Sequence, residues 1–170
     1  MAAVGKRKRL RLMPGDNIES EFPRLRQDGY SITSPGTDDY NCIAWAGGDT
    51  TRKWDPDPTS GRYWPKTVPR TLDVESFVQL FALEGGYSPC DSQAFEQGFE
   101  KIALFVSLSR EVTHAARQLP SGTWTSKLGD WEDIEHSTLS GLESAFYGQV
   151  AKILKRPRFE QAGRKRRNPS

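Results

Sequence analysis

The chain has 170 residues, 35% of them hydrophobic and 27% charged, and its net charge is +2. That length and hydrophobic content suffice for one compact core but not for two. No stretch comes near the roughly 18 apolar residues of a membrane span, and the N-terminus lacks the apolar segment of a signal peptide. We therefore expect a cytoplasmic protein without a membrane span, with export that needs no cleaved signal as the alternative.

Charge is concentrated at the two ends of the chain. Residues 1–13 carry +5 and residues 152–170 carry +7, so the stretch between them carries −10. Basic segments with few apolar residues cannot bury enough surface to fold. We predict a basic disordered arm at 1–13, a single domain at 14–157 and a basic disordered tail at 158–170. The ends could bind nucleic acid or another partner, whereas the acidic centre argues against a dedicated DNA-binding domain.

Cysteine and histidine are scarce. Cys42 and Cys90 are too few for a disulfide framework, and His114 and His136 lie 22 residues apart with no CxxC or HExxH motif in the chain. We predict neither a metal site nor a cofactor. Cys90 follows a proline on the segment that leaves a predicted helix, which is an ordinary position for an inert buried thiol.

Two helices are predicted in the N-terminal half, after an irregular segment at 14–37 with scattered Pro and Gly. The first is a short helix at 40–46, capped by Asp38 or Asp39 and ended by two glycines. The prolines of 49–70 then exclude regular structure, and the Trp and Tyr side chains of this long loop are expected to anchor it or to wall a cleft.

The second helix is predicted over 71–84, with Thr71 as its N-cap and two glycines as its end. Its apolar residues follow the i, i+3, i+4, i+7 spacing of a buried helical face, and they are Val74, Phe77, Val78 and Phe81. From residue 100 the pattern changes to that of β-strands. Strands are predicted at 101–106, 112–119, 123–128 and 147–155, with a hairpin turn at 120–122 and a loop at 129–136.

The chemistry of the chain centres on Cys42, which falls in the first turn of the predicted helix at 40–46. A helix N-terminus lowers a thiol pKa through its partial positive charge, and the thiolate is the reactive form. His114, on the second predicted strand, is the candidate general base and acid for this thiol. We therefore predict a Cys42–His114 catalytic pair.

A third residue is needed to fix the tautomer and orientation of His114. If Leu119 pairs with Thr123 across a three-residue turn, then Ser126 lies on the same face of the sheet as His114. A two-residue turn would place Lys127 on that face instead. Ser126 is the first candidate for the orienting residue, with Asp130 second because it is ionised and lies just past the strand; Lys127 stays open.

The order of Cys on a helix, His on a strand and a polar residue on the next strand resembles the papain-like cysteine peptidases and amidases, including the NlpC/P60 and CHAP groups. Residues 41–46 resemble their nucleophile helix, and residues 113–116 resemble their histidine strand. Residues 38–157 also resemble an uncharacterised family of small bacterial proteins described only as a domain of unknown function. Five stretches carry this second resemblance, namely 40–48, 63–65, 113–118, 124–129 and 133–136.

The papain-like resemblance implies an α+β fold in which N-terminal helices, one of them bearing Cys42, pack on a small antiparallel sheet. It implies a thiol hydrolase or acyl-transfer enzyme that acts on an amide bond of a peptide or protein, as a peptidase, amidase or deamidase, in the manner of a bacterial toxin or effector domain. The alternative is a catalytically inactive interaction module on the same scaffold, whose basic tails dock a partner or nucleic acid.

Overall fold

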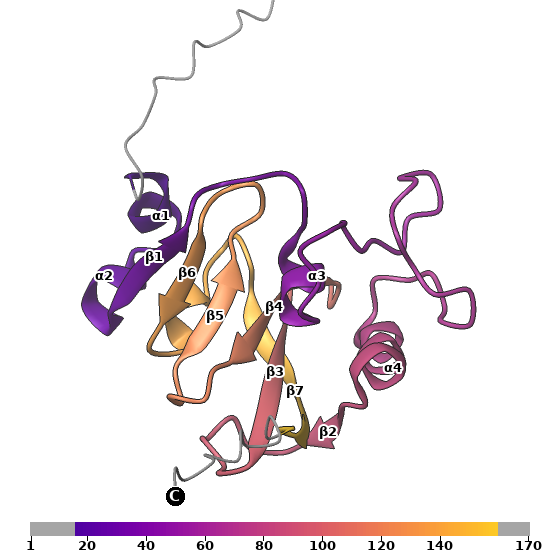
Figure 1. Cartoon of the computed structure of the whole chain (residues 1–170). Helices are drawn as coiled ribbons and strands as arrows, with labels where there is room; N and C mark the ends of the chain where they lie inside the picture. The colour runs from indigo at the N-terminus through magenta and orange to yellow at the C-terminus, as the bar shows by residue number, and fades with distance from the viewer. Residues whose placement is uncertain (1–15, 160–170) are drawn as a thin grey trace, which may run out of the picture.

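The computed structural model describes residues 16–159, which form an α+β fold around one antiparallel sheet of seven strands (Figure 1). The order of strands across the sheet is β1-β6-β5-β4-β3-β7-β2. Every neighbouring pair is antiparallel. The strands are β1 (Tyr30–Ser34), β2 (Ser88–Cys90), β3 (Phe99–Val106), β4 (Val112–Gln118), β5 (Trp124–Lys127), β6 (Asp133–His136) and β7 (Gln149–Pro157).

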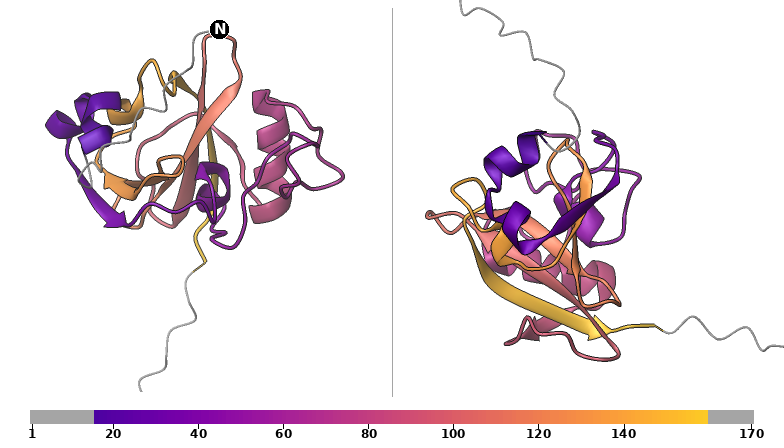
Figure 2. Two further views of the ribbon diagram at one scale, coloured as in Figure 1. Left: turned by 90° about the horizontal axis from the view of Figure 1, so that it is seen from above. Right: turned by 90° about the vertical axis from the view of Figure 1, so that its left-hand side faces the viewer.

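Helices cover both faces of the sheet, and the view from above in Figure 2 shows the sheet between them. The helices α3 and α4 lie on one face, with the long loop that joins them, and α1 and α2 lie on the other. Their bounds are α1 Asp16–Glu21, α2 Arg24–Asp28, α3 Cys42–Ala46 and α4 Val74–Gly85, with a 3₁₀ turn η1 at Ser140–Leu142.

The strand β3 is buried on both sides, which divides the core into two clusters. Ile102 and Leu104 join the cluster under α3 and α4, whereas Ala103 and Phe105 join the cluster under α1 and α2. This division follows from the geometry of a strand, in which successive side chains point to opposite faces. The continuous apolar run of this segment therefore correctly predicted a strand with no solvent-facing side.

The helix α3 begins at Cys42, and its N-cap is Asn41 rather than the predicted Asp38 or Asp39. Asn41 Oδ1 accepts hydrogen bonds from the backbone N–H groups of Ala44 (3.1 Å) and Trp54 (3.2 Å), and Asn41 Nδ2 donates to the carbonyl oxygen of Trp54 (2.8 Å). One amide side chain thus caps the helix and ties it to the following loop. An aspartate could cap the helix but could not donate to the loop carbonyl.

The predicted long helix and strands are present with shifted ends. α4 begins at Val74 after the N-cap Asp73, whose carboxylate accepts from the N–H of Ser76, so the predicted cap Thr71 was wrong by two residues. The loop at 49–70 is held by aromatic residues as expected, since Trp54 and Trp64 are both buried. The last strand begins and ends two residues later than predicted. The strands on each side of the 120–122 turn are slightly shorter than predicted.

Two helices, two strands and the 3₁₀ turn η1 were not predicted from the sequence. The segment expected to be irregular contains α1, α2 and the edge strand β1, and the expected loop at 129–136 contains β6. α1 and α2 span only six and five residues, too short to show a helical period. The strand β6 spans four residues and carries three charged or polar side chains, which hid its pattern.

The predicted basic arm at 1–13 and most of the tail at 158–170 lie outside the described residues. Arg158 is described, and it contacts the chain at the start of β3 and the end of β4: its backbone N–H donates to Gly98 O (2.7 Å) and its guanidinium donates to Gln118 O (3.2 Å). Within residues 16–159, none of the helices has the length and apolar character that crossing a membrane requires.

The double role of Asn41 gives a stability prediction. Replacing Asn41 by Ala removes three hydrogen bonds and should lower the free energy of unfolding by about 2 kcal/mol. Asn41→Asp keeps the two bonds to Oδ1 and should lose less than half of that amount. Urea unfolding of both variants measures the difference, and equal losses would show that the bonds to Oδ1 are not the source of the stability.

Candidate active site

Cys42 is the first residue of α3, and its helix packs on β4 and β5. Trp45, one turn further along, fixes the helix to β5 by donating from Nε1 to Thr125 Oγ1 (3.0 Å). Cys42 is partly exposed as a residue, and its side chain packs against the cluster under α3 and α4. The predicted position of the thiol at a helix start is therefore present in the structure.

Burial raises the pKa of the Cys42 thiol to about 11, although three backbone N–H groups oppose this effect. Those groups belong to Ala115 in β4 and to Ile43 and Cys42 at the start of the helix, and the charge of Lys127 acts in the same direction. Desolvation of the thiolate is the larger effect. At neutral pH Cys42 is a neutral thiol, and a base must remove its proton before or during attack.

His114 lies in β4 and is completely buried. Its ring stacks on that of Tyr147 (centroids 4.1 Å apart, planes at 15°) and meets the edge of Phe105, its neighbour across the strands, at 5.3 Å. The backbone at Gly148 passes so close to β3 that an added Cβ would lie 1.8 Å from Val106 O. No residue other than glycine fits there. This close approach brings the preceding residue, Tyr147, to its position over His114.

Ser126 bridges two histidines. Its Oγ lies 2.9 Å from His114 Nε2 and 2.8 Å from His136 Nε2, and all three residues are buried. The pairing of Leu119 with Thr123 across a three-residue turn, on which the choice of Ser126 depended, is present as a 2.8 Å bond from Leu119 N to Thr123 O. The structure thus brings His114 and Ser126 together, while their catalytic roles remain predictions.

The donor and the acceptor in each of these hydrogen bonds can be assigned by starting from the bond between His136 and Thr138. His136 Nδ1 lies 2.8 Å from Thr138 O, which can only accept, so Nδ1 of His136 carries the proton. The Nε2 atom of neutral His136 then accepts from the Ser126 hydroxyl. The Ser126 oxygen in turn accepts from Nε2–H of His114. The remaining nitrogen of His114, Nδ1, is therefore an unprotonated lone pair, and it has no hydrogen-bond partner within residues 16–159.

Both histidines are neutral at physiological pH. Burial lowers the pKa of His136 to about 4, against its usual value of 6.5, and the bond to Thr138 only partly offsets this. Burial also lowers the pKa of His114 well below the usual value, and His136 lowers it further. Neutral rings are required by the proton order derived above, in which each histidine has one accepting nitrogen.

Cys42 and His114 are not joined by a hydrogen bond. Cys42 packs against the cluster that contains Ala115, whereas the His114 ring packs against the opposite cluster. The two side chains thus lie on opposite faces of β4, and only the backbone of Ala115, the residue after His114, acts on the thiol, by lowering its pKa. Burial and then the charge of Cys42 raise the pKa of Tyr147, whose ring stacks on His114.

The other candidates for the third residue are engaged elsewhere. Asp130 forms an exposed ion pair with Lys53 (3.1 Å). Lys127 is buried on the other face of β5, where it donates to Trp131 O and lies over the ring of Tyr40. Asp133, which pairs with Lys127 across the strands, accepts hydrogen bonds from the hydroxyls of Tyr40 and Ser34. These residues hold the loop before α3 on the sheet.

His136 and Tyr147 are parts of the site that the sequence did not assign. His136 was hidden because β6 was predicted to be a loop; as a strand, β6 pairs His136 with Trp124 and so faces it toward Ser126. Tyr147 was placed inside the predicted last strand, but it belongs to the turn before β7. No group of three or more His, Cys, Asp or Glu side chains suited to a metal ion occurs among residues 16–159.

A family model described as a domain of unknown function (DUF7689) matches residues 31–155. The match covers β1, the site residues and nearly all of β7, and it agrees with the predicted resemblance of 38–157 to a family of unknown function. No curated protein matches the chain. No solved structure matches it either.

The buried histidines predict a loss of stability in mild acid. An unfolded histidine binds a proton below pH ~6.5, whereas folded His136 does so only near 4, so the unfolded state binds more protons between these values. Lowering the pH from 7 to 5 should therefore reduce the free energy of unfolding by about 2 kcal/mol through His136, and His114 acts in the same direction. Urea unfolding at several pH values measures this slope, which should be smaller in His136→Gln. An unchanged slope in that variant would contradict the assignment.

Proposed function

Because the chain belongs to the DUF7689 family, whose description states no activity, we propose its function from the candidate site: a papain-like thiol hydrolase or acyl-transfer enzyme that acts on an amide bond. Cys42 is the nucleophile, His114 the general base and acid, and Ser126 the residue that orients His114. The proposal is supported by the order of the three residues along the chain, with Cys42 at the start of α3, His114 in β4 and Ser126 in β5, which is the order that resembles the papain-like enzymes.

The observation that carries the proposal is the lone pair on His114 Nδ1. The bonds through Ser126 and His136 fix the proton on Nε2, and Nδ1 is left buried without a partner. A buried acceptor without a donor is costly, and such groups concentrate where a reaction uses them. A donor thiol at Nδ1 would satisfy it, and Cys42, on the opposite face of β4, is the proposed donor.

The proposed reaction starts from the neutral pair. The Cys42 thiol gives its proton to His114 Nδ1 as Sγ forms a bond to the carbonyl carbon of the amide. The C–N bond then breaks, and the amine leaves with the proton from Nδ1. Water, deprotonated by Nδ1, cleaves the thioester, or another nucleophile accepts the acyl group. Since Cys42 and His114 lie on opposite faces of β4 and no hydrogen bond joins them, this step requires α3 or β4 to move from the position described here.

The negative oxygen formed during attack needs donors, and the start of α3 supplies them. The first N–H groups of a helix have no partner within the helix, and those of Cys42 and Ile43 are directed at the thiol. The side-chain amide of Asn41, the residue before Cys42, already donates to Trp54 O. The backbone N–H groups are therefore the proposed oxyanion donors.

A second candidate function is the inactive interaction module, which the complete burial of His114 and Ser126 favours. In that case the chain of bonds from His114 to Thr138 only fixes β4, β5 and β6 in register. The raised pKa of Cys42 fits an inert core thiol equally well. The two functions differ in whether Cys42 reactivity depends on His114.

Thiol labelling separates the two functions. Iodoacetamide labelling at pH ~6, followed by peptide mass spectrometry, gives the rates for Cys42 and for Cys90, a second free and partly exposed thiol in the same molecule. If His114 acts as the base, His114→Ala should lower the ratio of the Cys42 rate to the Cys90 rate by about tenfold or more. Ser126→Ala, which keeps the base but removes its orienting bond, should lower the ratio less. Circular dichroism confirms that each variant is folded, and an unchanged ratio in folded His114→Ala would establish the module instead.

A further inference from the structure

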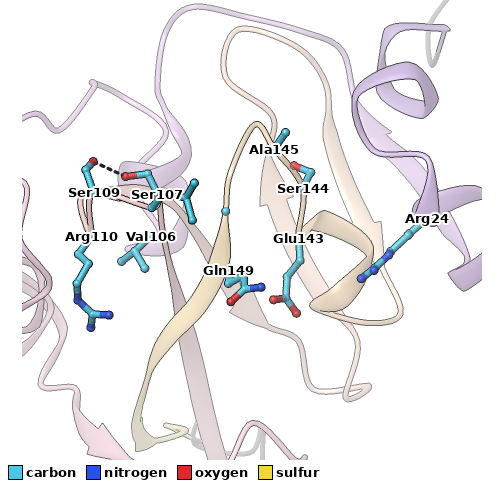
Figure 3. Close-up of a pocket in the computed structure, with 11 residues that line it drawn as sticks. Arg24, Val106, Ser107, Ser109, Arg110, Glu143, Ser144, Ala145 and Gln149 are labelled. Atoms are coloured by element: carbon cyan, nitrogen blue, oxygen red, sulfur yellow. Dashed lines mark hydrogen bonds between the residues drawn. The ribbon is translucent and has the colours of Figure 1, made fainter.

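A cavity whose lining does not include Cys42 lies at the tip of the β3–β4 hairpin. Its volume is about 910 Å³, within the range of small-molecule and peptide pockets. One wall is the hairpin tip at 107–110, and the other is the segment 143–149 with Arg24 at the start of α2 (Figure 3). The side chains of Leu108 and Phe146 are exposed at this end of the molecule.

The two walls differ in chemistry. The hairpin wall carries the guanidinium of Arg110 and the hydroxyls of Ser107 and Ser109, which are hydrogen-bonded to each other (2.8 Å). The opposite wall combines the guanidinium of Arg24 with the carboxylate of Glu143, and Figure 3 shows the Arg24 side chain extending toward Glu143 and the Glu143 side chain extending toward Gln149. Among the described residues, neither arginine nor Glu143 takes part in an ion pair. The charges of the cavity are therefore available to a ligand.

Arg110 adopts a backbone conformation that its residue type disfavours. Its φ of 63° is the only positive value at a non-glycine position in the described chain. The tip is closed by a 2.9 Å bond from Arg110 N to Ser107 O, a geometry in which Gly or Asn is preferred. Turn geometry therefore does not explain an arginine there, whereas a guanidinium on the wall of a cavity does.

We propose that this cavity binds an acidic segment of a polypeptide. Arg110 binds a side-chain carboxylate, since a guanidinium matches that group with two parallel hydrogen bonds, and whichever hydroxyl of the Ser107–Ser109 pair keeps a free hydrogen donates to the same carboxylate. Glu143, Gln149 and Arg24 on the other wall pair with the N–H and C=O groups of the peptide backbone. Leu108 and Phe146 contact its apolar side chains. This site is separate from Cys42, and the proposal does not depend on thiol chemistry.

Fluorescence anisotropy of the full chain tests the proposal at physiological ionic strength. The probe is a fluorescein-labelled peptide of Gly, Ser and Leu with a central run of glutamates, and the reference is the same peptide with glutamines. The glutamate peptide should bind about tenfold more tightly. Arg110→Gly removes the guanidinium but relieves the positive φ, so it should weaken binding about tenfold without lowering the melting temperature. Arg24→Gln should also weaken binding.

Two variants serve as controls. Arg26 lies on the same helix as Arg24 but does not line the cavity, so Arg26→Gln should bind the glutamate peptide as the parent does. Glu143→Gln removes a like charge from the cavity and should strengthen binding. Equal affinity for the two peptides would overturn the proposal. The proposal would also be overturned if Arg110→Gly and Arg24→Gln bound the glutamate peptide with the affinity of the parent. Binding would then arise at the basic ends of the chain.

Discussion

The burial of β3 on both faces is the constraint on which the rest of the structure depends. A strand with apolar side chains on both sides requires a layer on each face of the sheet. One layer is α3, α4 and the aromatic loop between them, and the other is α1, α2 and the turns around Tyr147. The thiol of Cys42 comes from the first layer, and the ring that covers His114 comes from the second. The candidate site exists because β4, beside β3, is in contact with both.

The parts of this fold that depend on local sequence patterns could be predicted from the sequence. The apolar spacing of α4, the double-sided run of β3 and the three-residue turn after β4 are all visible in the residues themselves, and the turn alone led to Ser126 as the partner of His114. The short elements were missed because four to six residues do not establish a period. The cap of α3 was missed because the loop carbonyl that selects Asn41 belongs to Trp54, thirteen residues further on. His136 and Tyr147 are brought to His114 only by pairing and packing over longer distances.

The chain of bonds from Thr138 to His114 joins structure to the proposed chemistry. Each bond in it fixes the donor and acceptor of the next one, so a backbone carbonyl in the turn after β6 determines which nitrogen of His114 is basic. A low local dielectric strengthens such bonds and also makes the unpartnered Nδ1 costly. The same burial that orders the ring weakens it as a base, because it lowers the pKa of His114. Because burial also raises the pKa of the Cys42 thiol to about 11, the transfer of its proton to this imidazole is unfavourable while both groups stay buried.

The position of β7 in the sheet has a consequence for the order of assembly. β7 lies between β3 and β2, although it is made after both, and β2 has no other partner in the described sheet. During synthesis, β3 therefore exposes one unpaired edge until the residues of β7 have emerged from the ribosome. Contacts this distant along the chain slow folding, and an apolar strand with an open edge can associate with other chains. The pairing of β7 with β3 thus removes the one edge of β3 at which another chain could add a strand.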